Sequence, residues 1–280
     1  MHVAVLTYHS MNIAGTDYAR NDHVALAADL QYLVEQGVMF VPASVLVEIL
    51  VTGKVPPDLR GRHAVTLTCD DGSDYDFRPI LHGRYGQHSG FFNLLRGATR
   101  RRWWPFGHRF AHPHMTSFVI ASPEARAELD RACLGGRGLW NEDWWPLAVK
   151  SGRMQIGNHS WDHRHEALPE PMRPQRMPGS FLAVDSAEEA ELQIRKAGAY
   201  IHRQAPNPAD SLFAYPYGDV PDWLADHWLP REPTTRAAFT TEPLFVTSST
   251  NRYRIPRFVC GHHWRSPEQL QCVVERSGFF

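Results

Sequence analysis

Residues 65–72 constrain the fold of this chain more than any other stretch. Apolar and β-branched side chains alternate along the run, and this pattern predicts a buried β-strand. The run stops at two adjacent carboxylates, Asp70 and Asp71, which are followed by a glycine. Because α/β proteins bind ligands at the carboxyl ends of their strands, we expect both carboxylates to face a cleft.

The rest of the chain reads as alternating strands and helices. Strands are predicted over residues 3–8, 38–41, 116–121, 154–158, 211–214 and 237–241. Helices are predicted over residues 24–37, 44–50, 122–133, 140–150, 186–204, 222–228 and 266–276, with serine N-caps at Ser44 and Ser122. This alternation indicates an α/β fold with a parallel sheet, either open or closed as a barrel.

Length and charge restrict the organisation and the partners of the protein. With 280 residues, 43% of them hydrophobic, we expect a single domain over 1–280, carrying an insertion at about 82–113 that is rich in Arg, Trp, Pro and His. The formal net charge of −1 gives neither the basic footprint of a nucleic-acid-binding protein nor that of a protein bound to an anionic membrane.

The sequence also indicates a compartment. The first eight residues resemble a strand and lack the pattern of a secretion signal, and no apolar run approaches the roughly 18 residues that cross a bilayer. The four cysteines are scattered without the spacing of a disulfide framework or a zinc knuckle. We therefore expect a soluble, cytoplasmic protein.

Polar residues follow several predicted strands, and the carboxyl ends of parallel strands meet at one edge of a sheet. The residues in these positions are His9, Asp70, Asp71, His159 and the segment 215–217. His159 and His163 are four residues apart, a spacing that brings two imidazoles to one side of a helical turn. With one carboxylate they form a two-histidine, one-carboxylate metal site that leaves positions open for water and substrate.

The two adjacent acids suit such a site. One carboxylate can bind a divalent cation while its neighbour accepts a proton from a water that the cation makes more acidic. The competing interpretations are that the aspartates cap the helix after Gly72 and that the histidines are ordinary surface residues in a chain with 16 of them.

Three motifs in order resemble those of the polysaccharide deacetylase superfamily, also called the NodB-homology or carbohydrate esterase family 4 enzymes. Residues 68–72 (Thr-Cys-Asp-Asp-Gly) are similar to the family's Thr-Phe-Asp-Asp-Gly, and residues 159–163 to its paired-histidine motif. Residues 214–218 (Ala-Tyr-Pro-Tyr-Gly) are similar to its Arg-x-Pro-Tyr-Gly. The resemblance covers roughly residues 1–265 and implies a distorted (β/α) barrel of about seven strands.

The resemblance implies roles for five of these residues. Asp71, His159 and His163 would bind one divalent metal ion, with zinc as first choice and cobalt, nickel or iron also accepted by this donor set. Asp70 would be the general base, and the backbone N–H of Tyr217 would stabilise the oxyanion. The implied activity is removal of an acetyl group from an N-acetylated sugar or oligosaccharide.

Two departures from the family motifs concern the strand ends. Cys69 stands where the family has Phe, a buried position that a small thiol can fill. Ala214 stands where many members have an Arg that orients the catalytic Asp. We expect Arg257 or Arg254 to take over this role.

The general acid also departs from the common pattern, because the family's carboxy-terminal Leu-x-His motif is not found cleanly. Residues 7–10 (Thr-Tyr-His-Ser) resemble the opening of poly-N-acetylglucosamine deacetylases, in which the order of barrel elements is permuted. We therefore assign the general acid to His9, ahead of His262.

Substrate contacts are expected from four residues: Trp161, Tyr215, Pro216 and Arg257. Indole faces suit the apolar faces of sugar rings, although Trp140 and Trp144 are equally suited to pinning the insertion to the barrel. Two alternatives remain at this point. One is a hydrolase of another non-peptide C–N bond, similar to allantoinases or cyclic imidases, and the other is a non-catalytic carbohydrate-binding barrel.

Overall fold

The main sheet is built from parallel strands around β1 and β3. The computed structural model describes residues 1–100, 109–169, 177 and 179–280. Strand order is β10-β1-β3-β6-β7-β8-β9, with β11 beside β1 and β2 beside β3, and only β10 pairs antiparallel. The strands are β1 (His2–His9), β2 (Met39–Phe40), β3 (Ala64–Asp70), β6 (Met115–Val119), β7 (Met154–Asn158), β8 (Leu212–Ala214), β9 (Ala237–Phe239), β10 (Val246–Thr247) and β11 (Phe258–Val259).

Residues 255–259 close the sheet into a barrel. Ile255 forms a parallel bridge with Phe239 of β9, and β11 then pairs with Leu6 and Thr7 of β1. The first and last strands of the sheet are thus joined through one short segment. The predicted distorted (β/α) barrel is confirmed, whereas a separate hairpin of β4 (Ile80–His82) and β5 (Gly86–His88) was not predicted.

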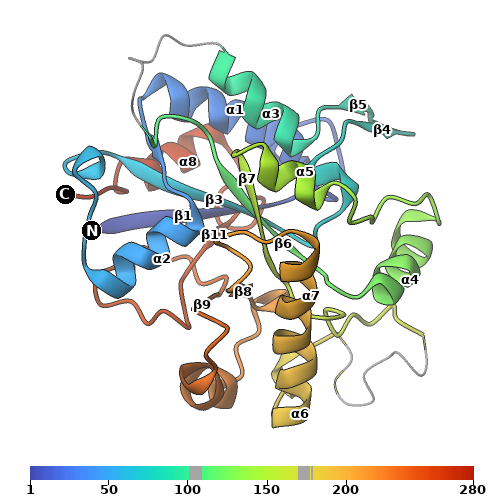
Figure 1. Cartoon of the computed structure of the whole chain (residues 1–280). Coiled ribbons are helices and arrows are strands. Elements are labelled where there is room, and N and C mark those ends of the chain that lie inside the picture. The colour runs from blue at the N-terminus through green and yellow to red at the C-terminus, as the bar shows by residue number, and fades with distance from the viewer. Residues whose placement is uncertain (101–108, 170–176, 178) are drawn as a thin grey trace.

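Helices surround this barrel (Figure 1). They are α1 (Asp22–Glu35), α2 (Ala43–Thr52), α3 (Phe91–Arg100), α4 (Pro123–Leu134), α5 (Trp145–Lys150), α6 (Ala187–Ala190), α7 (Ala197–Gln204) and α8 (Pro267–Val274). A π-helical segment, Glu191–Lys196, joins α6 to α7, so the helix predicted over 186–204 is essentially continuous.

Alternate residues of β1 face two different cores. Leu6 and Tyr8 pack in one hydrophobic cluster with residues of α1, α3 and α8, whereas Val3 and Val5 pack in another with residues of α2. Figure 1 accordingly shows α1, α3 and α8 together on one side of β1 and α2 on the other. Because both faces of the strand are covered, every residue from Val3 to Tyr8 is buried.

Two local expectations need correction. Ser44 does not cap α2, since Pro42 occupies that position and the Ser44 hydroxyl donates to Gln155 instead. The range 82–113 is not wholly an excursion, because it contains α3, whose Phe91 and Leu95 are buried in the core; its part from 101 to 108 lies outside the described residues. Ser122 does cap α4, as predicted, by accepting the N–H of Ala125.

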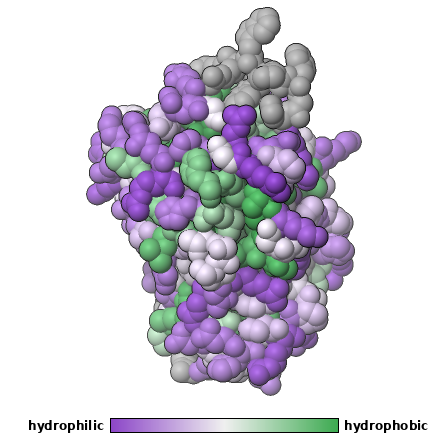
Figure 2. All heavy atoms as spheres, turned by 90° about the vertical axis from the view of Figure 1, so that its left-hand side faces the viewer, coloured by the Kyte–Doolittle hydropathy of each residue, from purple (hydrophilic) through white to green (hydrophobic). Residues whose placement is uncertain are grey.

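The two termini lie side by side at the amino ends of the central strands. His2 and Gly278 exchange backbone hydrogen bonds of 2.8 and 2.7 Å. Figure 2 views the molecule from the side on which Figure 1 places both termini, and hydrophobic side chains gather in the centre of this side within a hydrophilic rim. Among the helices that the structure describes, none has the length and apolar character needed to span a membrane.

Candidate active site

The polar residues predicted at the strand ends do converge on one pocket. His9 and Asp70 are register partners at the ends of β1 and β3, and His159 follows β7. A pocket of about 430 Å³ is lined by these three residues together with Asp71 and His163. The carboxyl end of the parallel sheet therefore forms a cleft with both predicted carboxylates and all three predicted imidazoles on its wall.

Asp71, His159 and His163 form a compact group of ligand atoms. Nε2 of each histidine lies 3.7 Å from Oδ1 of Asp71, and the three ligand atoms all lie within 4.8 Å of one another. The two histidines do not share a helical turn as the sequence suggested. Instead the loop after β7 bends sharply, with positive φ at Ser160 (73°) and His163 (63°), and this bend turns the second imidazole back toward the first.

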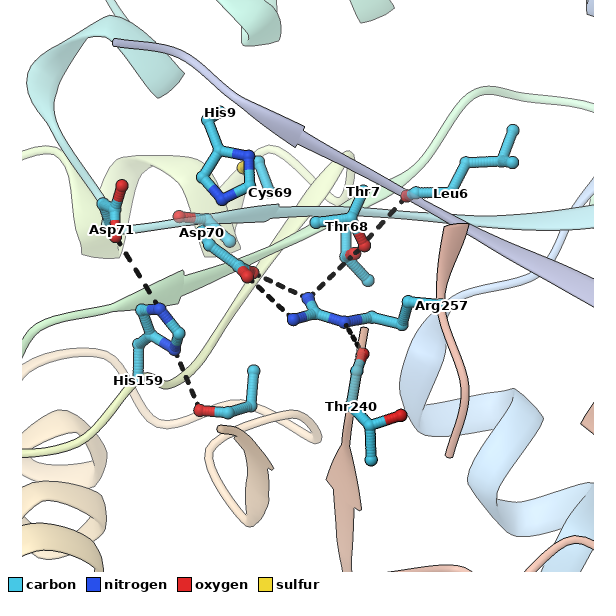
Figure 3. Close-up of polar contacts among 12 residues, drawn as sticks. Leu6, Thr7, His9, Thr68, Cys69, Asp70, Asp71, His159, Thr240 and Arg257 are labelled. Carbon is cyan, nitrogen blue, oxygen red and sulfur yellow. Dashed lines mark hydrogen bonds and ion pairs between the residues drawn. The ribbon is translucent and has the colours of Figure 1, made fainter. Parts of the chain in front are cut away.

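Hydrogen bonds and burial prepare both imidazoles to act as ligands. Nδ1–H of His159 donates to the carbonyl of Ala214 at 2.9 Å, which leaves the Nε2 lone pair directed toward Asp71 (Figure 3). Burial, together with the neighbouring imidazoles of His159 and His165, lowers the pKa of His163, so its ring is neutral at pH 7. A neutral imidazole with an available lone pair is the form that binds a metal ion.

The backbone at Asp71 is held in an uncommon conformation. Its φ is 75° and that of Gly72 is 74°, and a Cβ on Gly72 would lie 2.9 Å from the backbone Cα of Val119. Trp140 fixes this turn, since its indole N–H donates to the carbonyl of Asp71 at 2.9 Å. Strained backbone that is held by surrounding contacts is typical of functional sites.

Asp70 points into the barrel and pairs with Arg257. The guanidinium donates to both carboxylate oxygens at 2.7 Å, and its Nε donates to the carbonyl of Thr240 at 2.8 Å (Figure 3). Burial alone would raise the pKa of Asp70, but the charge and hydrogen bonds of Arg257, with a contribution from His159, hold it below its ordinary value. Arg257 thus occupies the role left open by Ala214, while Arg254 pairs at the surface with Asp222 and Asp226.

The segment after β8 brings Tyr217 to the pocket. Tyr217 has a φ of 59°, and its side chain is 44% exposed. Gly218 follows with a φ of 76°, and a Cβ there would collide with the Thr241 hydroxyl. Among the described residues, the backbone N–H of Tyr217 has no acceptor. A free N–H on a rigid turn at the pocket wall is suited to binding an anionic oxygen.

The four residues assigned to substrate contacts do not line the pocket. Tyr215 is fully buried and its hydroxyl donates to the carbonyl of Tyr253, and Pro216 is buried beside it. Arg257 is fully buried beneath Asp70. Trp161 packs against Tyr200 of α7, and the ammonium group of Lys196, in the π-helical segment, lies 3.7 Å from its ring centroid. Substrate contact by these four residues therefore stays a prediction.

His9 and His262 both line the pocket, but they differ in their neighbours. His9 influences the pKa values of Asp70 and His163, which places its imidazole close to both, and Figure 3 draws it beside Asp70. His262 is exposed and, like His9, acts on the pKa of Asp22, but it is not among the causes of the shifts at Asp70 and His163. Of the two, His9 lies nearer the ligand group.

Sequence reasoning gave no role to His165 or Cys133, and it treated Trp140 as a residue for packing. All three line the pocket. The imidazole of His165 lies 5.7 Å from that of His163, and its nearness in the sequence was the available signal. Nothing local indicated Trp140, which is 69 residues from its partner Asp71.

Comparisons with known proteins agree with this geometry. The family model described as polysaccharide deacetylase matches residues 109–227, which include His159, His163 and the segment 214–218. No curated protein sequence matches the chain.

Solved structures share its fold. A deacetylase from Streptococcus pyogenes, PplD, solved with acetate, superposes with a TM-score of 0.65 at 16% identity over 98% of each chain. IcaB from Ammonifex degensii gives 0.60 at 18% identity, over 99% of this chain and 97% of that one. A de-N-acetylase from Aggregatibacter actinomycetemcomitans gives 0.62 at 13% identity, over 98% and 100%. The match to the polysaccharide deacetylase model covers residues 109–227, less than half of the chain, and the barrel is the fold of these solved structures.

Proposed function

We propose that this protein is a metal-dependent hydrolase that removes the acetyl group from an N-acetylated sugar or oligosaccharide. The observation that carries the proposal is the group of Asp71, His159 and His163, whose ligand atoms lie within 4.8 Å of one another beside Asp70. The match of residues 109–227 to the polysaccharide deacetylase model supports the class of reaction.

The residues present fit a divalent cation. Two neutral imidazoles and one carboxylate are a donor set that zinc and related ions accept, and three protein ligands leave positions open for water and substrate. Nε2 of His163, like that of His159, is directed toward Oδ1 of Asp71 at 3.7 Å, so a cation between them would be reached by both rings. A cation held there would polarise the amide carbonyl and make a water easier to deprotonate.

Asp70 is the proposed general base. The pair with Arg257 keeps its carboxylate ionised at neutral pH, so it is always ready to accept a proton. A carboxylate stabilised in this way is a weak base, and proton transfer to it therefore needs a water of lowered pKa. The two-point contact with Arg257 also fixes the direction in which Asp70 presents its oxygens.

Tyr217 and His9 complete the proposed reaction. The backbone N–H of Tyr217 would donate to the oxyanion that forms when the amide carbonyl is attacked, at the moment when negative charge develops. His9, close to Asp70 and on the pocket wall, would give a proton to the departing amine. Without that proton the amine is a poor leaving group.

The test combines metal content with acetate release. Wild type, Asp71→Ala and His163→Ala are purified, their zinc, cobalt, nickel and iron contents are measured, and each is incubated with a panel of N-acetylated monosaccharides and oligosaccharides. We expect about one metal ion per chain in wild type, loss of metal from both variants, and acetate release by wild type alone. Metal binding without acetate release would redirect the assignment to other amides, and absence of metal after reconstitution would overturn it.

A further inference from the structure

A second groove lies at the opposite end of the sheet from the candidate active site. It has a volume of about 650 Å³ and is walled by the start of α2, the segment before β6 and the segment before β7. Arg153 and Gln155, at the amino end of β7, line this groove, whereas His159 follows the carboxyl end of the same strand. The two sites are therefore separated by the length of the strand.

Positive charge dominates the lining of this groove. Its charged side chains are Lys54, Arg109, Arg153, Arg236 and a single acid, Glu48. Glu48 is already paired with Arg236 at 2.5 Å. Across the described ranges, Lys54, Arg109 and Arg153 have no ion-pair partner. Three cations facing one groove without a counter-charge repel one another, and an anion would relieve that repulsion.

The groove wall also contains buried polar atoms without partners. Among the described residues, Nη1 of Arg153 and Nδ1 of His114 are both buried and make no hydrogen bond. The side-chain oxygen of Gln155 accepts from Ser44, an arrangement that leaves its amide nitrogen as a donor. A buried polar group without a partner is unfavourable, so native structures seldom retain one unless water or a ligand satisfies it.

The pKa values of two groups in the groove wall reflect burial beside positive charge. Burial lowers the pKa of Arg153, and the charge of Arg96 adds to the effect. Burial and the charge of Arg153 lower the pKa of His114 to about 4. In both cases the protonated form is disfavoured first by burial and then by a neighbouring cation.

We propose that this groove binds the phosphate group of a phosphorylated small molecule, through Arg153 with Lys54 and Arg109. The planar guanidinium of Arg153 can donate hydrogen bonds to two phosphate oxygens. The double negative charge of a phosphate dianion can also offset the positive charge of more than one side chain. The volume exceeds what one phosphate fills, so the remainder of the groove would hold the organic part of a phosphate monoester.

The test is calorimetric titration of the full chain with inorganic phosphate, methyl phosphate and dimethyl phosphate at constant ionic strength. Titrations are made in the His163→Ala background as well, so that phosphate bound to a metal ion at the active site does not contribute. The variants are Arg153→Gln and Arg153→Lys, and the control is Arg137→Gln, an exposed arginine outside the groove.

We expect saturable phosphate binding that Arg153→Gln weakens about tenfold or more, that Arg153→Lys weakens less, and that Arg137→Gln leaves unchanged. If methyl phosphate binds and dimethyl phosphate does not, the ligand is a phosphate monoester, as proposed. If the two bind equally, the ligand is instead part of a phosphodiester chain. Absence of saturable binding to wild type, or equal affinity in Arg153→Gln, overturns the proposal. Neither result depends on deacetylase activity.

Discussion

Arg257 and Asp70 are 187 residues apart in the chain, yet they form a buried pair with two hydrogen bonds of 2.7 Å. The arginine comes from the segment that closes the barrel and reaches Asp70 at the end of β3 from the barrel interior. The segment that closes the barrel therefore also orients the proposed base.

Replacing Arg257 with Ala should cost both stability and activity. The substitution leaves the Asp70 charge buried without a partner, a defect worth about 3–5 kcal/mol. Arg254→Ala is the matched control, because its partners Asp222 and Asp226 are surface acids and exposed pairs contribute about 0–1 kcal/mol. Urea unfolding and kcat/KM measure the two effects. Equal losses in the two variants would show that Arg257 has no special role.

Acid should destabilise the protein through Asp70. Its pKa is depressed in the folded state, so its stabilising contribution is present above the pKa of the unfolded chain, about 3.9, and is lost as pH falls toward the folded value. Asp70→Asn should be less stable at neutral pH, because Arg257 loses its counter-charge, but its stability should fall less steeply below about pH 4. Urea unfolding of the metal-free proteins across this range measures the difference. If the stabilities of wild type and Asp70→Asn fell equally steeply with pH, Asp70 would not be the group responsible for the acid sensitivity.

Gly218→Ala should abolish most activity by moving the turn that carries the Tyr217 N–H. The new Cβ meets the Thr241 hydroxyl, and the residue must also keep a φ of 76°. Gly53→Ala is the control, since its φ of 69° imposes similar strain with no neighbour within 4 Å. We expect each to lose about 1 kcal/mol or more in stability, with kcat reduced only in Gly218→Ala. Adding Thr241→Ala should recover part of the loss.

Trp140→Phe should weaken metal binding. It removes the indole N–H that holds the carbonyl of Asp71, and loss of such a supporting contact lowers metal affinity about 10–100-fold. Trp144→Phe provides the control, because the indole N–H of Trp144 is buried without a partner and no hydrogen bond is lost. Competition with a zinc-binding dye measures both affinities. Unchanged metal affinity in Trp140→Phe would mean that the turn at Asp71 keeps its conformation without the Trp140 hydrogen bond.

His9→Ala should reduce kcat about 10²–10⁴-fold while metal content stays at the wild-type level, because a general acid acts on the leaving amine rather than on the cation. His262→Ala should have a much smaller effect, since its exposed ring lies at the pocket wall away from Asp70. Acetate release and metal analysis of both variants decide between them. The reverse order of effects would move the general acid to His262.

The sequence by itself determined the parallel sheet and the strand ends that meet at the site. Alternating apolar residues define β3 and β7, and the polar residues that follow them can only lie at the carboxyl edge of the sheet. The N-cap at Ser122 could also be predicted, because its side chain bonds to a backbone N–H three residues later and the interaction depends only on nearby residues.

Only the tertiary structure decided which distant groups serve these residues. A buried carboxylate requires a counter-charge, but the choice of Arg257 over Arg254 depends on which one the closing segment directs inward. Likewise the motif residues of 214–218 gave no sign that Tyr215 is buried while Tyr217 lines the pocket. Such contacts have no local sequence pattern, because the atoms meet only after the chain has closed around them.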